Sequence, residues 1–123
     1  MMLGLALLEK GEPEEAGNVL EPIVAELEGF SFPQWHGLAS TLLGEACRAA
    51  HRLDEASGFA DRGLQITTSV GYGYGVGLSH RVVGRIARDR CADAEASAAF
   101  QQALDVFERI GGRFEAARTR LEI

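Results

Sequence analysis

Residues 82–104 read VVGRIARDRCADAEASAAFQQAL, and this stretch decides the fold. Its Gly84 is followed twelve residues later by Ala96, and the same step from glycine to alanine occurs twice earlier in the chain. The earlier steps are Gly4 to Ala16 and Gly44 to Ala56, so all three are evenly spaced. A fixed period of this length, about 40 residues, is typical of solenoids, in which each unit is a pair of helices that buries its apolar face against neighbouring units. The sequence therefore predicts an all-α fold of antiparallel helix pairs that recur with this period.

Apolar side chains recur at helical spacing within each unit. In the second unit they predict an amphipathic helix from about Pro33 to Ala50. The predicted apolar face consists of Leu38, Leu42, Leu43, Ala46, Cys47 and Ala50. A short turn is expected after each first helix, and these turns fall at Gly11, His51 and Cys91. Pro22 lies inside one of the second helices, where we expect a kink rather than a break.

The phase of the repeat divides a single helical domain, residues 1–123, into units. We expect complete units at residues 31–70 and 71–111, and partial units at residues 1–30 and 112–123. The repeats are therefore expected to be truncated at both ends. Self-assembly through these incomplete terminal helices, as a homodimer, is one function that this division suggests.

Composition excludes some functions and favours a location. The net charge of -6 argues against general nucleic-acid binding. The apolar opening, residues 1–8, has no basic residue before it and is followed by acidic residues, so it predicts neither a signal peptide nor a membrane span. The two cysteines form no C-x-x-C pair and are expected to be reduced thiols in a cytoplasmic protein. Charge is uneven, because residues 1–32 carry a net -6 whereas residues 71–123 carry a net +1.

The repeated residues resemble the tetratricopeptide motif, whose first helix carries W-x2-L-G-x2-Y and whose second carries A-x3-F. Leu43-Gly44 and Val83-Gly84 match the L-G step of the first helix. Ala96, Phe100 and Ala103 match the second helix. The period is longer than the usual repeat of about 34 residues, and the tyrosine position of the motif holds Leu7, Cys47 and Ala87. The resemblance implies a right-handed α-solenoid.

The arginine-rich ending of the chain, residues 111–121, also looks like the helical regions of large bacterial signalling ATPases and LuxR-type regulators. This narrower resemblance implies a sensor or scaffold segment without the ATPase and DNA-binding parts. Both resemblances imply a non-enzymatic module that binds a protein or peptide partner, with no cofactor and no membrane or nucleic-acid partner.

In tetratricopeptide arrays the first helices line the concave face, which implies a set of exposed positions in this chain. In the second unit they are Leu38, Thr41, Glu45, Arg48 and Ala49. In the third unit they are Leu78, Arg81, Arg85, Arg88 and Asp89, and in the last unit the position is Arg118. Because Arg81, Arg85 and Arg88 follow helical spacing, we expect three guanidinium groups in one stripe, with Arg48 and Arg118 on adjacent helices.

Two interpretations of this arginine stripe stay open. Arginine forks bind carboxylates in two-point geometry, so the stripe indicates a groove for an acidic peptide or partner segment. The other interpretation is a solvated face that Glu45 and Asp89 partly neutralise. The candidate partner-binding residues are Arg48, Arg81, Arg85, Arg88, Arg118 and Glu45.

The remaining candidate motifs of the sequence are interpreted as structural features. Cys47 and His51 are one helical turn apart, but Cys91 lies a full repeat away and a fourth ligand is missing, so no metal site is expected and the thiols are assigned to the core. The glycine run at residues 71–77 lacks the ending of a phosphate loop and is expected to be a turn that opens a first helix. Trp35 is expected in the core, and no catalytic residues are assigned.

Overall fold

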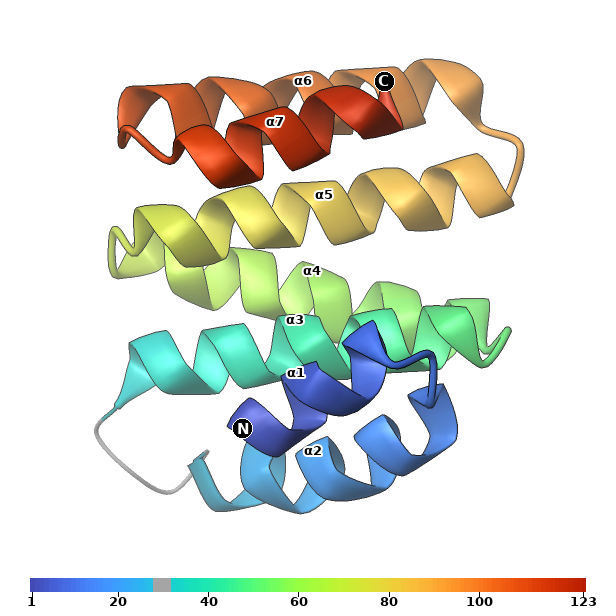
Figure 1. Ribbon diagram of the computed structural model, residues 1–123. Coiled ribbons are helices and arrows are strands. Elements are labelled where there is room, and N and C mark those ends of the chain that lie inside the picture. Colours follow the sequence, from blue (N-terminus) through green and yellow to red (C-terminus); the bar gives the residue numbers. More distant parts are fainter. Residues whose placement is uncertain (28–31) are drawn as a thin grey trace.

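The protein is all-α in the computed structural model, which describes residues 1–27 and 32–123 (Figure 1). These residues form seven helices and no strand. The helices are α1 (Met2–Glu9), α2 (Pro13–Leu27), α3 (Pro33–Ala49), α4 (Leu53–Ser69), α5 (Gly73–Asp89), α6 (Asp93–Arg109) and α7 (Arg113–Glu122). The expected boundary between units at residues 30 and 31 lies outside the described residues.

Helix starts recur at a constant interval along the chain, equal to the period of the glycine-to-alanine steps. The starts of α2, α4 and α6 are Pro13, Leu53 and Asp93, each one period after the one before. The starts of α3, α5 and α7 are Pro33, Gly73 and Arg113, with the same interval. The helix predicted from Pro33 to Ala50 is confirmed to within one residue as α3. The α2 helix continues through Pro22, so a break is excluded, and the expected kink stays a prediction.

Each turn that the structure describes completely, which leaves out the one between α2 and α3, uses one residue in the left-handed region. At the turns predicted from the sequence, φ is 78° at Gly11, 66° at His51 and 60° at Cys91. The amide that follows bonds back to a carbonyl five residues earlier, as Arg52 N does to Cys47 O at 2.8 Å. This is the Schellman arrangement, which satisfies carbonyls that a helix end would otherwise leave unpaired. The same local geometry therefore ends successive helices and reverses the chain.

Small residues set how closely the paired helices approach. A Cβ added at Gly44 would lie 3.0 Å from the backbone nitrogen of Ala60, and one added at Gly84 would lie 2.8 Å from the ring of Phe100. Both contacts join positions sixteen residues apart. Glycine is required there because there is no room for a side chain. The repeated Gly-to-Ala spacing in the sequence thus corresponds to repeated contacts between helices.

Consecutive helices pack against each other, and α3 also contacts α1 and α5 directly. Figure 1 shows α1 and α2 at one end of the stack and α6 and α7 at the other. The largest fully buried side chains include Phe107 and Leu20. Trp35, which was expected in the core, is 43% exposed; it lies in the first turn of α3, and its ring meets that of Tyr72 edge to face. None of the helices described in residues 1–27 and 32–123 is long and apolar enough to cross a membrane.

Candidate functional site

A groove of about 320 Å³ runs over the face formed by α1, α3, α5 and α7. Its lining is mainly apolar and includes Leu5 and Leu8 from α1, Leu42 from α3 and Leu78 and Val82 from α5. These side chains project at helical spacing from neighbouring helices, so the apolar surface is continuous across them. Charged residues from all four helices border the groove, including Glu9 of α1.

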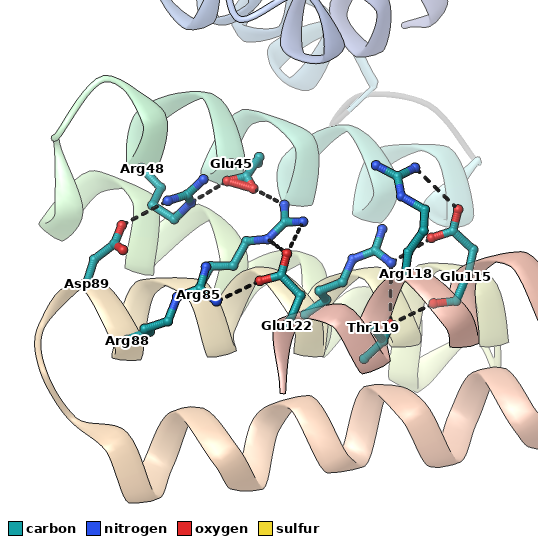
Figure 2. A network of polar contacts seen from close by, with 10 residues as sticks. Glu45, Arg48, Arg85, Arg88, Asp89, Glu115, Arg118, Thr119 and Glu122 are labelled. Atoms are coloured by element: carbon teal, nitrogen blue, oxygen red, sulfur yellow. Dashed lines mark hydrogen bonds and ion pairs between the residues drawn. The ribbon is translucent and has the colours of Figure 1, made fainter.

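Arg85 is the centre of the charged border (Figure 2). Its Nη1 lies 2.6 Å from Glu45 Oε2 on α3, and its Nη2 lies 2.8 Å from Glu122 Oε1 on α7. Nε of the same guanidinium donates to the same Glu122 oxygen at 3.1 Å, so two nitrogens of Arg85 share one acceptor. Charge-assisted hydrogen bonds of this kind are stronger than those between neutral groups. One arginine therefore ties three helices together.

Two further arginines extend this network on either side of Arg85 (Figure 2). Arg48 pairs with Glu45 on its own helix and with Asp89 Oδ2 on α5, at 2.9 Å. Arg88 pairs with Glu122 Oε2 at 2.8 Å and lies over the ring of Phe100, 5.4 Å from its centroid. Glu45 and Glu122 thus each serve more than one guanidinium.

A second cluster joins α5 to the start of α7. Arg81 is only 5% exposed, and its Nη1 lies 2.7 Å from Glu115 Oε2 and 3.4 Å from Thr119 Oγ1. The guanidinium also lies over the ring of Phe107, 5.6 Å from its centroid. Arg118 approaches the other oxygen of Glu115 at 3.9 Å, and its side chain is 42% exposed. Arg118 is therefore the most loosely paired arginine of this cluster.

The protonation equilibria follow from this pairing. Burial favours the neutral form of Glu122, but hydrogen bonds and charges from Arg85 and Arg88 outweigh it and lower the pKa of this carboxyl. Burial also opposes the charge of Arg85, yet the two carboxylates around it raise the pKa of its guanidinium. For Arg81 burial is the larger effect, and it lowers the pKa despite the contact with Glu115. All three groups keep their charges at neutral pH.

The structure brings together all six residues proposed from the sequence as partner-binding. Their expected exposure, however, was wrong for several positions of the face. Leu38, Thr41, Glu45, Leu78 and Arg81 are buried. The neighbouring first helix covers them, as the 2.7 Å contact between Thr41 Oγ1 and Ser79 Oγ illustrates. Positions that line the concave face of a tetratricopeptide array are covered here because adjacent first helices are in close contact.

Sequence reasoning missed the two carboxylates that α7 supplies. Glu115 and Glu122 are seven residues apart, which places them on one face of a helix two turns apart. They follow Arg81 and Arg85 by slightly less than one repeat period. A search of the sequence for opposite charges separated by about one repeat would detect this spacing. Together with Glu45 and Asp89 they give four carboxylates against five arginines.

The remaining candidates have ordinary structural surroundings. Cys47 is a buried free thiol whose pKa is raised by burial, whereas Cys91 is exposed at its turn, so the assignment of Cys91 to the core was wrong. The hydroxyl of Ser40 donates to Phe59 O at 2.9 Å. Over residues 1–27 and 32–123, no group of three or more His, Cys, Asp or Glu side chains is placed to hold a metal ion.

The glycine run opens α5 as expected. Gly71 has a φ of 68°, and α5 begins at Gly73. Tyr72 and Tyr74 pack at 6.1 Å between ring centroids, and Tyr74 continues to Phe107 at 6.4 Å. Burial raises the pKa of both tyrosines, so their hydroxyls are neutral at physiological pH. This segment is thus a helix start held by aromatic contacts.

Comparison of the chain with protein-family models, with curated proteins and with solved structures found no match.

Proposed function

We propose that this chain is a non-enzymatic interaction module, a right-handed tetratricopeptide-like α-solenoid that holds a segment of a partner protein. The constant interval between helix starts and the recurring Gly44 and Gly84 contacts support the repeat array. The observation that carries the function is the groove of about 320 Å³, which is mainly apolar and is bordered by charge. Grooves of this kind bury apolar side chains of a ligand while polar groups fix its orientation.

The charges around the groove favour an acidic partner segment. The charged residues that line the groove are four arginines and three glutamates, which leaves one positive charge in excess. Arg118 lines the groove, is loosely paired and is partly exposed, so its guanidinium is available to a ligand carboxylate. We therefore expect the bound segment to place aliphatic side chains against Leu42 and Leu78 and a carboxylate near Arg118.

Arg81 and Arg85 have a different role in this proposal. Both are largely buried against carboxylates of α7, and Arg85 also holds Glu45. Because a ligand would have to replace these internal pairs, they position the groove wall rather than contact the ligand. The resemblance to bacterial signalling ATPases and LuxR-type regulators adds the proposal that this chain is a sensor or scaffold segment of such a cytoplasmic regulator.

The test uses a synthetic peptide of alternating leucine and glutamate pairs, and the same peptide with glutamine in place of glutamate. Titration followed by NMR should shift the resonances of Leu42 and Leu78, with tighter binding of the glutamate peptide at low salt. Arg118→Ala should weaken that binding about tenfold, since it removes a charge-assisted hydrogen bond. Arg113→Ala, at an exposed arginine of α7 that does not line the groove, is the matched control.

Two outcomes would contradict the proposal. Equal, salt-insensitive binding of both peptides would show that the groove does not select an acidic partner and binds through its apolar lining. Resonance shifts confined to residues outside α1, α3, α5 and α7 would show that the peptide binds elsewhere on the protein.

A further inference from the structure

Tyr74 brings a hydroxyl group without a protein partner to the groove. It lies in the first turn of α5 and lines the groove together with Phe114 and Arg118 of α7. Its side chain is partly buried, and within residues 1–27 and 32–123 its hydroxyl makes no hydrogen bond. Tyrosine hydroxyls that are withdrawn from water usually have a hydrogen-bond partner. A ligand in the groove would supply that partner.

The charges around this hydroxyl favour an anion. Burial is the main reason why the pKa of Tyr74 is raised, and the charged side chains that contribute are Glu115, Arg81 and Arg118. All three of these charged residues line the groove. Glu115 and Arg81 pair with each other at 2.7 Å, whereas Arg118 approaches the same carboxylate only at 3.9 Å (Figure 2). One positive charge in excess therefore lies close to the Tyr74 hydroxyl.

Ring contacts fix the direction of the Tyr74 side chain. Its ring centroid lies 6.1 Å from that of Tyr72 and 6.4 Å from that of Phe107, with the ring planes tilted in both cases. A tyrosine has few rotatable bonds, so a ring that is held in place presents its hydroxyl at little cost in conformational entropy. The donor is thus in position before a ligand binds, and preorganised donors increase affinity.

The neighbouring tyrosine has a purely structural environment. Tyr72 does not line the groove, burial alone raises its pKa, and its ring also meets that of Trp35 at 6.3 Å between centroids. The packing of the repeat does not require a hydroxyl at the position of Tyr74 either, because the equivalent positions one period away hold Gln34 and Phe114. The hydroxyl of Tyr74 is therefore a feature of the groove and not of the repeat.

We propose that Tyr74 determines the specificity of the groove, and that its hydroxyl and the Arg118 guanidinium hold one carboxylate of the partner segment. This role of Tyr74 rests on the proposed function of the groove. Two donors, the O–H of Tyr74 and an N–H of Arg118, require two acceptor oxygens, which a carboxylate has. A carboxamide offers one oxygen and would turn its own N–H groups towards a donor. The site therefore accepts the side chain of glutamate or aspartate and rejects that of glutamine or asparagine.

Tyr74→Phe tests this role, because it removes the hydroxyl and keeps the ring. In NMR titrations with the peptide of alternating leucine and glutamate pairs, the variant should bind about tenfold more weakly than the unmodified protein, since a hydrogen bond to a charged group is lost. Binding of the glutamine peptide should change less than about threefold. Tyr72→Phe is the matched control and should bind both peptides like the unmodified protein. Its ring belongs to the same aromatic contacts, so a general weakening of these contacts would affect both variants.

A spectroscopic measurement reports on the hydroxyl directly. The chain has two tyrosines, so selective isotope labelling of the ring carbon that bears the hydroxyl gives two signals, and Tyr72→Phe identifies which of them belongs to Tyr74. The glutamate peptide should shift the signal of Tyr74 and leave that of Tyr72 in place, because only the hydroxyl of Tyr74 is expected to donate to the ligand.

The double variant Tyr74→Phe with Arg118→Ala should lose less affinity for the glutamate peptide than the product of the two separate losses, because both side chains hold one carboxylate. Separate losses that multiply would show that the two residues act on different groups and would overturn the shared contact.

The outcomes distinguish this role from the proposed function. If the glutamate peptide shifts Leu42 and Leu78 and Arg118→Ala weakens its binding, but Tyr74→Phe binds as tightly as the unmodified protein, the role of Tyr74 is refuted and the proposed function stands. If the glutamate peptide shifts no resonance of the groove, the proposed function fails and the role of Tyr74 fails with it.

Discussion

Arg85 binds Glu122 through two of its nitrogens, at 2.8 Å and 3.1 Å, and so joins α5 to the last helix of the described structure. The same guanidinium reaches Glu45 of α3 at 2.6 Å. Both partners are mostly buried, so neither can exchange the lost arginine for full hydration. Arg85 therefore holds α7 in position together with Arg81 and Arg88 of the same helix.

Arg85→Ala should lower the free energy of unfolding by about 1–3 kcal/mol, because it leaves two partly buried carboxylates without their main partner. The midpoint of urea unfolding measures this loss. Arg113→Ala, at an exposed arginine of α7, should change the free energy of unfolding by less than about 0.5 kcal/mol. Equal losses in the two variants would show that the contacts of Arg85 do not stabilise the fold.

Stability should also decrease in acid through Glu122. Because its pKa in the folded protein is below the ordinary value of 4.5, the unfolded chain binds the proton more readily. The stabilisation is complete above the ordinary pKa and is lost as the pH falls through the lower, folded-state pKa. Urea midpoints measured from pH 7 to pH 3 should therefore fall less steeply for Glu122→Gln than for the unmodified protein. Parallel curves would contradict the lowered pKa.

Gly84→Leu should destabilise the protein by about 1–3 kcal/mol through overpacking. Its added Cβ would meet the ring of Phe100 at 2.8 Å, inside a contact between α5 and α6. Gly58→Leu is the matched control, because no heavy atom lies within 4 Å of a Cβ there, and it should leave stability equal or raise it by up to about 1 kcal/mol. Thermal unfolding compares the two. Similar melting temperatures would argue against the close packing at Gly84.

The sequence predicted the helices and their pairing because both depend on spacing along the chain. Gly44 and Gly84 mark close approaches of helices that are joined by a short turn, so a local pattern contains the information. The exposure of Arg81 was not predictable in the same way. It depends on Glu115 and Phe107, which lie on the two following helices and come together with Arg81 only when pairs stack.

The candidate site was likewise predicted in part, where the information is local in the sequence. Helical spacing predicted that Arg81, Arg85 and Arg88 share one face, and the contacts of α5 confirm it. The pairing of that face with α7 requires knowing which carboxylates of the next helix are turned inwards. Glu115 and Glu122 have the required spacing, but charge spacing alone does not distinguish an inward face from a solvated one. For this reason the sequence alone left two interpretations of the arginine stripe open, a ligand-binding surface and a neutralised, solvated face.

Cys91→Gly should stabilise the protein, because Cys91 adopts a φ of 60° in the turn between α5 and α6. The left-handed region costs a residue with a Cβ about 1–2 kcal/mol, whereas glycine enters it freely, as Gly11 does at the equivalent turn with a φ of 78°. Glycine also gains freedom in the unfolded chain, which reduces the expected net gain to about 0.5–1 kcal/mol. The side chain is exposed, so its removal forfeits little packing. Cys91→Ala keeps the Cβ and should show no such gain in the urea midpoint. Equal stabilisation by alanine and glycine would mean that backbone strain at this turn does not limit stability.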